Sequence, residues 1–519
     1  MSSIDHFIEI GIALSSENNH ARLLEKILIS TIELANCEGG TIYSVSSEHN
    51  LVFETVINRT LDIHLGGCSD NPIDFEPIPL KIYGKPNDTA LAAIAAESRE
   101  IINVEDAYTC TTYPLDAAKK MDEALGYKTT SVLTLPMANH QDDLNGVIQL
   151  INAKDESGQI IPFSSKVQRT IHAMSSLAAV ILTNKQLIDE MEELFSSFSK
   201  LIAYAIDQKS PYTGEHCRRV PEITMRLANA CHKIQNGPLA SFTMTREDFH
   251  ELSVAAWLHD CGKVATPEYV MDKATKLETV FDRIELINAR FEVAARDIYN
   301  SPKLSQTDKV KQLKDLEQDR DFINTANKGG EFFTDENIER VYRIARQYQV
   351  TIKGRKLPVL SDDEVYNLIT QRGTLNAKER RIINGHMDVT VQMLESMPFP
   401  KHLRNVPEYA CGHHEKMDGT GYPKGLKRHE MSIPARIMAI ADVFEALTAN
   451  DRPYKPPKTL TETLTIMGRM KLNDHLDPDL FDVFISEKVY LEFARDFLDP
   501  SQIDDVDLTK IPGIQSDTN

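Results

Sequence analysis

The sequence predicts a multidomain protein: an N-terminal α/β domain around an antiparallel sheet (1–165), a connecting helix (166–207), an all-α domain (208–500) and a polar tail (501–519). Three observations predict this fold class. The length of 519 residues is sufficient for roughly two to four domains. Helix and strand patterns alternate over the first 160 residues, and helical patterns dominate after Pro211. Between these regions, neither Pro nor Gly interrupts residues 163–210.

The N-terminal domain is predicted from the order of its elements. Apolar residues at helical spacing predict a helix over 20–36, and Gly39-Gly40 predicts a turn after it. The next elements are predicted as a strand pair, a helix and a second strand pair, over residues 41–45, 51–57, about 88–98, 131–137 and 146–153. This order favours helices packed on an antiparallel sheet.

The connecting segment predicts one long helix. Met191, Leu194, Phe198, Leu201 and Ala205 recur at steps of three and four residues. A helix this long favours a connector that pairs with a second copy of itself, and therefore a homodimer. The alternative is a helix packed inside its own domain.

Bulk composition excludes several classes of protein. The formal net charge of −20 argues against a surface for polymeric nucleic acid, although it allows a small phosphate-bearing substrate in a local cleft. No uninterrupted apolar run of about 18 residues predicts a membrane span, and the acidic N-terminus is not a secretory signal. Seven scattered cysteines without a CxxC pair argue against disulfides and thiolate zinc, which favours the cytoplasm.

A set of histidines and aspartates carries the candidate chemistry. His259-Asp260 follows the apolar run 252–258, and His413-His414 opens the motif HHEKMDGTGYP. Three further residues lie in helical segments or beside them, namely His216, His386 and Asp442. Taken singly, each is also compatible with a polar helix end, a surface loop or a satisfied core residue. Together, five His and two Asp suit two divalent transition-metal ions with nitrogen and oxygen ligands, a device for phosphoester hydrolysis.

At this point the motifs resemble a family. HDCGK at 259–263, His386, HHEKMDGTGYP at 413–423 and ADVFEALTANDRPYK at 441–455 resemble the HD-GYP subgroup of the HD phosphohydrolases, over residues from about 200 to 500. The resemblance implies a bacterial signalling enzyme that hydrolyses cyclic di-GMP and/or 3′,3′-cyclic GMP-AMP to linear dinucleotide or mononucleotides. It also implies two ions of iron or manganese. The alternatives are a cyclic dinucleotide receptor without turnover, and an HD phosphohydrolase acting on another nucleotide.

The resemblance also implies residue roles. Asp260 would bridge the ions, and Lys263 would contact the scissile phosphate and assist the leaving oxygen. Arg452, and as a second candidate Lys455, would meet a phosphate or a guanine. The substrate loop would be shaped by Gly421, Tyr422 and Pro423. The implied metal ligands are His216, His259, Asp260, His386, His413, His414 and Asp442.

The chain departs from the family pattern in three places. Glu445 replaces a common Asp and one extra residue precedes Arg452, which puts details of the substrate loop in question. Tyr212 stands where some members have a further Glu ligand, so two ions are expected and not three. Residues from about 275 to 372 form an inserted helical region, interpreted either as a surface elaboration or as a contact for a partner or a second copy.

The N-terminal domain resembles a GAF sensor domain. The resemblance is carried by residues 20–36, 41–45, 98–108 and 131–154, and it implies a site for a small ligand of unknown identity. Asn152, Lys154 and Phe163 are similar to part of a cyclic-nucleotide signature, but the Asp-Glu pair of that signature is missing. No cyclic nucleotide is therefore assigned to this domain.

Overall fold

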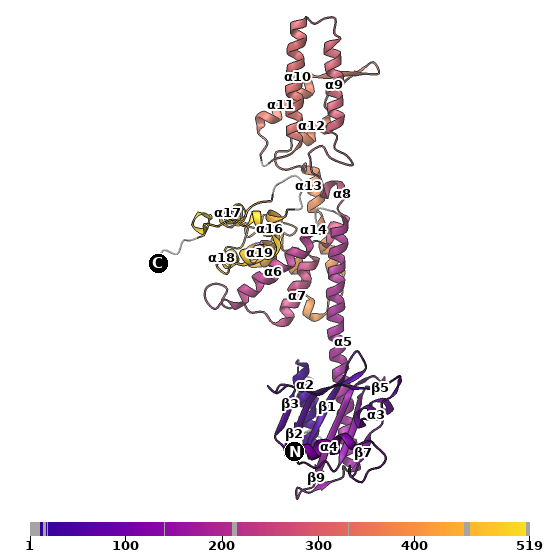
Figure 1. Ribbon diagram of the computed structural model, residues 1–519. Coiled ribbons are helices and arrows are strands. Elements are labelled where there is room, and N and C mark those ends of the chain that lie inside the picture. The colour runs from indigo at the N-terminus through magenta and orange to yellow at the C-terminus, as the bar shows by residue number, and fades with distance from the viewer. Residues whose placement is uncertain are drawn as a thin grey trace. The chain divides into compact units, whose positions relative to one another are not determined.

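The computed structural model describes residues 11–13, 17, 19–139, 141–209, 215–330, 332–450 and 457–514. Contacts divide the chain into two compact units, Met1–Leu194 and Phe195–Asn519. The predicted fold class is confirmed, because an antiparallel sheet with helices is followed by one long helix and a helical region (Figure 1). Among the helices of the described ranges, none combines the length and apolar character needed to span a membrane.

The first unit is built on an antiparallel sheet with the strand order β3-β2-β1-β9-β8-β7, to which β4 and β10 add at β2 and β9. A separate small pair joins β5 and β6. The strands are β1 Cys37–Val45, β2 Asn50–Asn58, β3 Ile63–Gly66, β4 Ile78–Pro79, β5 Lys81–Ile82, β6 Lys85–Pro86, β7 Ile102–Val104, β8 Val132–Ala138, β9 Leu144–Lys154 and β10 Ile160–Ile161. The helices are α2 His20–Ala35, α3 Leu91–Ser98, α4 Asp116–Leu125 and the first part of α5 Ser165–Lys209.

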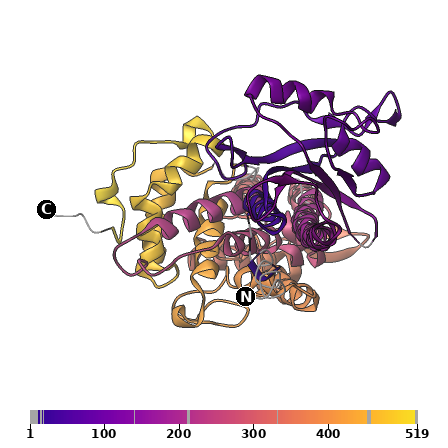
Figure 2. The same ribbon diagram turned by 90° about the horizontal axis from the view of Figure 1, so that it is seen from below.

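Helices cover both faces of this sheet (Figure 2). On one face, Leu24 of α2 and Met174 of α5 share a core with Leu135 and Leu150 of the sheet. On the other face, α3 packs its alanines against the strands. The sheet is therefore buried on both sides.

The predicted turn at Gly39-Gly40 is wrong. Both glycines lie inside β1, and the chain turns at Asn36, which has a left-handed backbone with φ of 49°. A Cβ atom on Gly39 would lie 2.3 Å from the Ile57 carbonyl oxygen, and one on Gly40 would lie 2.8 Å from that of Gln149. These glycines allow close strand approach and do not make a turn.

The second unit has a helical core that surrounds the candidate site. Its helices are α6 His216–Lys233, α7 Arg246–Leu258, η1 Cys261–Ala265, α8 Glu268–Met271, α13 Ala377–Asn384, α14 His386–Ser396, η2 Lys401–Leu403, α15 Val406–Cys411, η3 Arg428–Glu430, α16 Ile433–Thr448, α17 Leu460–Leu472, α18 Pro478–Ser486, α19 Val489–Phe497, η4 Pro500–Gln502 and η5 Leu508–Lys510. Residues 500–514, which include most of the predicted polar tail, are packed against the helical core, because Ile511 is buried and the Pro512 carbonyl lies against Gly468.

The chain between α8 and α13 has a core of its own. Leu277, Phe291, Ile323, Ile344 and Leu368 are among its buried members. The elements here are α9 Ile284–Tyr299, α10 Gln306–Asn327, α11 Asp335–Gln347, β11 Gln349–Ile352, β12 Arg355–Pro358 and α12 Asp362–Leu368. The β11–β12 hairpin was not predicted, because the sequence was interpreted as helical over the whole inserted region from about 275 to 372.

Candidate metal centre

Five helical segments bring the seven candidate ligands together. His216 begins α6, and His259 and Asp260 directly follow α7. His386 begins α14, and Asp442 lies within α16. His413 and His414 follow α15. The site is thus assembled from helix ends and one helix face in one helical core.

The ligand atoms form two groups. Those of His216, His259 and Asp260 all lie within 4.8 Å of one another, and so do those of His386, His413 and His414. Three nitrogen or carboxylate atoms at such separations can surround one cation. The arrangement therefore offers two adjacent cation positions.

Asp260 connects the two groups. Its Oδ2 lies 3.1 Å from His216 Nε2 and 3.3 Å from His259 Nε2, whereas its Oδ1 lies 3.3 Å from His386 Nε2. Asp442 spans the groups in the same way, with Oδ1 3.4 Å from His216 Nε2 and Oδ2 3.8 Å from His414 Nδ1. Each carboxylate thus turns one oxygen toward each group.

Three histidines are anchored in the same manner. His259 Nδ1 lies 2.8 Å from the Ala256 carbonyl oxygen, three residues earlier in the chain. His386 and His413 repeat this contact at 2.5 Å and 2.6 Å, again with a carbonyl three residues earlier. A backbone acceptor requires the proton on Nδ1, so Nε2 is left with its lone pair facing the centre.

Whether cations fit this cluster can be judged from its buried polar atoms that have no hydrogen-bond partner. Within the described chain, His386 Nε2, His413 Nε2 and Asp260 Oδ1 are such atoms. A buried lone pair without a partner is costly unless a cation or donor satisfies it. Burial also lowers the pKa of His413 to about 4 and that of His414 well below its ordinary value, which keeps both imidazoles neutral. These donors fit divalent transition metals.

Glu445 supports His216 from behind the cluster. Its Oε2 is hydrogen-bonded to His216 Nδ1, and its Oε1 accepts from Arg219 Nε at 2.8 Å. Burial raises the pKa of Glu445, but His216 and Arg219 outweigh it and hold the value at about 2. Burial likewise lowers the pKa of His216, yet Glu445 and Asp260 raise it to about 10. Positive charge is therefore stabilised at this position.

The role of Glu445 corrects the sequence interpretation, which connected this departure with the substrate loop. Glu445 lies three residues after Asp442 on α16, on the same helix face, and this spacing was the available signal. Arg219 is buried and is paired with Glu445 and Glu215.

Gly262 sets the distance between η1 and α14. A Cβ atom at this position would lie 2.0 Å from the His386 carbonyl oxygen and 2.6 Å from Thr390 N. In addition, Gly262 N donates to Thr390 Oγ1 at 3.0 Å. Only glycine allows this approach, which places Asp260 beside His386.

Lys263 and Lys209 belong to the same region. Lys263 Nζ is paired with Asp260 Oδ2, and both side chains are largely buried. The pKa of Lys263 is raised, because Asp260 outweighs the effect of burial, so the amine carries its proton. Lys209, the last residue of α5, donates to the carbonyl oxygens of Lys263 at 3.4 Å and Thr266 at 2.6 Å. The sequence interpretation did not include Lys209.

The predicted substrate loop is held by Glu415. Its buried carboxylate accepts from the backbone N of Lys424 at 2.7 Å, Gly425 at 3.0 Å and Leu426 at 2.9 Å. A Cβ atom on Gly421 would lie 2.4 Å from Glu415 Cα, so glycine is required for this close packing. The loop is thereby fixed beside the cluster.

Tyr422 is the loop residue that contacts the cluster. Its backbone N donates to the His414 carbonyl at 3.2 Å, and the two rings lie 4.9 Å apart. The Tyr422–Pro423 peptide is cis. Of the other predicted substrate contacts, Arg452 and Lys455 lie outside the described residues.

The described residues also line cavities away from the metal centre. The first unit has a cavity of about 580 Å³ between the sheet and α3 and α4. Its walls are mostly apolar, and its polar groups are paired: Asp122 accepts from Tyr108 and Thr129, and Tyr43 bonds Gln149. Asn152 and Lys154 make internal contacts with Glu38.

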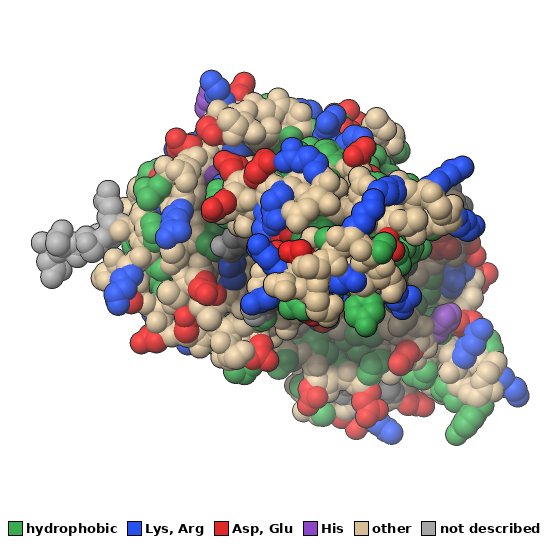
Figure 3. Space-filling view, turned by 90° about the horizontal axis from the view of Figure 1, so that it is seen from above, with side chains coloured by type: hydrophobic (Ala, Val, Ile, Leu, Met, Phe, Trp, Pro, Cys, Tyr) green, Lys and Arg blue, Asp and Glu red, His purple; other side chains and the backbone are tan. Residues whose placement is uncertain are grey.

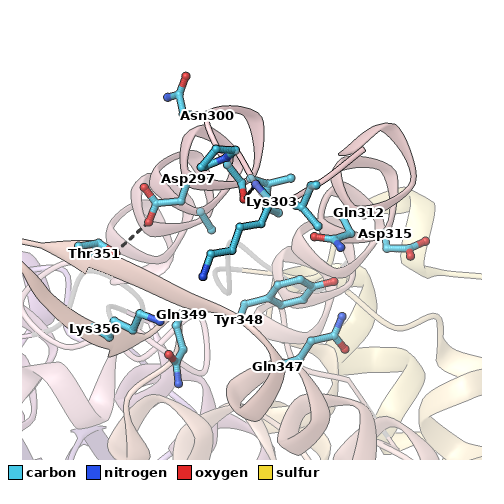
Figure 4. A pocket seen from close by; sticks show the side chains of 15 residues that line it. Asp297, Asn300, Lys303, Gln312, Asp315, Gln347, Tyr348, Gln349, Thr351 and Lys356 are labelled. Carbon is cyan, nitrogen blue, oxygen red and sulfur yellow. Dashed lines mark hydrogen bonds between the residues drawn. The ribbon is translucent and has the colours of Figure 1, made fainter. Parts of the chain in front are cut away.

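Another cavity is a groove of about 780 Å³ between α9, α10 and β11 (Figure 4). Lys303 and Lys356 line it together with Asp297 and Asp315. Asp297 accepts from the backbone of Thr351. On the face of the molecule that is seen from above, Lys and Arg side chains are interspersed with Asp and Glu (Figure 3). Because both signs of charge occur in the groove, its electrostatics do not select one ligand charge.

The fold and cluster define a helical domain with a buried His/Asp cluster that could hold cations. A family model described as HD domain matches residues 360–480, which include His386, His413, His414 and Asp442. His216, His259, Asp260 and Lys263 precede the matched segment. The family match therefore covers one group of ligands and Asp442.

Three curated relatives are similar over short segments. The 3′3′-cGAMP-specific phosphodiesterase 1 of Vibrio cholerae is 39% identical over 118 residues, which are 23% of this chain and 26% of that protein. The probable cyclic di-GMP phosphodiesterase of Vibrio cholerae is 43% identical over 93 residues, 18% of this chain and 21% of that protein. The cyclic di-GMP phosphodiesterase of Thermotoga maritima is 33% identical over 131 residues, which are 23% of this chain and 35% of that protein. The chain thus spans at most about a third of these relatives.

Solved GAF domains are also similar to the chain. The GAF domain of an Acinetobacter phosphoenolpyruvate-protein phosphotransferase is 14% identical with a TM-score of 0.26, covering 36% of this chain and 98% of that domain. The corresponding domain from Coxiella burnetii is 12% identical with a TM-score of 0.28, covering 36% and 96%.

Proposed function

We propose that this protein is a metal-dependent phosphodiesterase that hydrolyses a bacterial cyclic dinucleotide, namely cyclic di-GMP and/or 3′,3′-cyclic GMP-AMP. The observation that carries the proposal is the pair of three-residue ligand groups, connected by Asp260 and Asp442. The names of the curated relatives support the substrate class.

The proposed cofactor is a pair of iron or manganese ions, held by the seven His and Asp side chains. When bound, such a pair lowers the pKa of a water and offsets the charge that develops on phosphoryl oxygens. The mixed nitrogen and oxygen ligands suit either metal.

The chain's own residues are proposed to bind and orient the substrate around this centre. Lys263 keeps its proton beside Asp260, so its ammonium can offset charge on the scissile phosphate or the leaving oxygen. Tyr422 places an aromatic ring next to His414, where it can cover the phosphodiester or stack on a base. Glu445 fixes the orientation of His216.

A metal-controlled assay tests the proposal. Purified full-length protein, loaded anaerobically with Fe(II) or with Mn(II), is incubated with cyclic di-GMP, 3′,3′-cyclic GMP-AMP and cyclic di-AMP. We expect linear dinucleotide from at least one guanine-containing substrate, and loss of turnover in Asp260→Asn and after chelation. Tight binding without turnover in the loaded protein would favour the receptor, and turnover of other nucleotides alone would favour another HD phosphohydrolase.

For the first unit, we propose that the 580 Å³ cavity takes a small, uncharged and largely apolar ligand. Four polar residues of its wall, Tyr43, Asp122, Thr129 and Gln149, are already hydrogen-bonded, which disfavours a phosphate-bearing ligand. Native mass spectrometry of the full chain, with Ala92→Trp in the cavity wall as a blocked control, tests whether such a ligand co-purifies. The division into residues 1–165, 166–207 and 208–500 remains a proposal.

A further inference from the structure

An apolar stripe runs along the connecting helix α5 on a side that its own domains leave exposed. Leu187, Met191, Leu194, Phe198 and Leu201 are 57%, 47%, 70%, 48% and 61% exposed. Large apolar side chains scattered singly on a surface are normal, but a contiguous row indicates an interaction surface.

The spacing of the stripe is that of a coiled coil. Its members follow one another at steps of four, three, four and three residues, which is the a/d pattern of a heptad. With Leu187 at d and Met191 at a, Val180 falls on the preceding d position and Ala205 on the a position that follows Leu201. The pattern therefore continues for more than three heptads along one helix of 45 residues.

The protein's own core does not use this stripe. In the second unit, α5 packs Ala203 and Ile206 into the helical core, and Phe195 and Ile202 lie against it. Ala203 and Ile206 fall at f and b, away from the stripe, and Phe195 and Ile202 fall at e, beside it. Leu194, Phe198 and Leu201 of the stripe itself are exposed. The stripe is thus an additional apolar face.

We propose that α5 forms a parallel, in-register, two-stranded coiled coil with α5 of a second copy of this chain. A heptad stripe is self-complementary, so a second copy presents the face that it requires. Four acidic side chains lie in this stretch, and none occupies an a or d position: they are Asp189 at f, Glu190 at g, Glu192 at b and Glu193 at c. Like charges are therefore kept out of the centre of the seam, and the acidic character disfavours an anionic lipid surface as the occupant.

Asn184 argues for the orientation and register. It is exposed and occupies the a position between Val180 and Leu187. An Asn at a single a position meets its counterpart only when the two helices are parallel and in register, since any other arrangement buries its amide against apolar side chains. The proposal goes beyond a homodimer by fixing this geometry, and it does not depend on the proposed enzymatic activity.

The first experiment measures the mass of the full chain in solution by sedimentation equilibrium. We expect a dimer for the wild type and for Glu193→Lys, and a monomer for Leu194→Lys. The two variants place the same charge on neighbouring exposed residues, one outside the seam and one within it. A monomeric wild type, or a Leu194→Lys dimer as stable as the control, would overturn the proposal. Circular dichroism verifies that each variant is folded.

The second experiment tests orientation by cross-linking in a Cys68→Ser background, which removes the exposed native thiol. Identical a or d residues face each other across a parallel in-register coil. Leu187→Cys and Leu201→Cys should therefore each form a homotypic disulfide under mild oxidation, whereas Glu193→Cys should not. In an antiparallel pair, two positions this far apart cannot both meet their counterparts. Cross-linking at only one of them, or at neither, rejects the parallel arrangement.

Discussion

Because Gly262 has no side chain, the segment η1 can pack directly against α14, and the two groups of candidate ligands lie close together. We expect Gly262→Ala to push η1 away from α14, because its Cβ would lie 2.0 Å from the His386 carbonyl oxygen. Overpacking of this kind costs about 1–3 kcal/mol. Thermal unfolding and metal content are the measurements, and both should fall. Gly330→Ala is the matched control, since a Cβ there meets nothing within 4 Å. Equal behaviour of the two variants would contradict this role.

Glu445 is expected to act through His216. Glu445→Gln removes the charge that pairs with His216 and Arg219, and loss of such a supporting carboxylate typically weakens metal binding about 10–100-fold. Metal titration followed by elemental analysis measures this effect. Glu445→Asp keeps the charge on a shorter side chain, so it should recover part of the affinity. If Glu445→Gln binds metal like the wild type, His216 is held by other contacts.

Lys276 makes stability depend on pH. Burial lowers the pKa of this lysine to about 8, whereas an unfolded lysine titrates near ~10.4. Between these values the unfolded chain binds a proton that the folded chain does not, so the free energy of unfolding rises with pH through this window, by up to about 3 kcal/mol. Below it, the lysine is charged in both states and the cost of burial is complete.

Urea unfolding of the wild type and Lys276→Met at about pH 7.5 and about pH 10 isolates this contribution from other titrating groups. The free energy of unfolding of the wild type, relative to that of Lys276→Met, should be higher at about pH 10 than at about pH 7.5. A constant difference would mean that the amine titrates normally. In Lys276→Met the Leu368 carbonyl, which lies 2.8 Å from Lys276 Nζ in the wild type, loses its donor at both pH values, so this loss cancels when the two pH values are compared.

The candidate metal ligands could be predicted from the sequence, whereas the residues that support them could not. His259-Asp260 and His413-His414 are visible because each pair lies in a recognisable motif. Glu445 and Lys209 were not assigned these roles from the sequence, because a carboxylate behind a histidine and a lysine that binds backbone carbonyls depend on how separate helices meet. Arg452 and Lys455 stay predictions.

At the scale of elements, Lys209 joins the end of α5 to the segment that carries Lys263. We expect Lys209→Met to release the carbonyl oxygens of η1 and to lower kcat between about tenfold and 100-fold, as small misplacements of reacting groups do. Metal content and KM should change little. Steady-state kinetics on the metal-loaded protein decides this, and Lys209→Arg, which keeps the donors, should be milder. A parallel loss of bound metal would instead mean that η1 has unfolded.

Element prediction succeeded where local periodicity dominates. The helices α2 and α5 and the strands β8 and β9 follow their apolar patterns. It failed at Gly39-Gly40, where close strand packing requires glycine, and at the β11–β12 hairpin, whose short strands lie in a charged stretch dominated by helical patterns. Tertiary contacts, which single-sequence patterns do not contain, decided both cases.

For the whole molecule, the expected insertion at about 275–372 has the features of an independent unit. Its buried residues form a core that is separate, among the described residues, from the core around the metal centre. Its two ends meet, because Thr374 Oγ1 donates to the Lys273 carbonyl at 2.9 Å. Lys273 Nζ also pairs with Glu379 of α13 at 2.6 Å, outside the inserted stretch.

These contacts predict that residues 275–372 can be replaced by a short Gly-Ser linker without loss of the helical core. The variant should fold, keep its metal content and retain hydrolysis within about tenfold of the intact chain, because no candidate ligand lies in the deleted part and its removal opens no cavity in the core around the site. Metal analysis and the cyclic dinucleotide assay measure this. The same linker inserted at the Lys353-Gly354 hairpin tip controls for the linker itself. Retained metal with lost turnover would show that the insertion contributes to substrate binding, and loss of both would show that the two cores are energetically one.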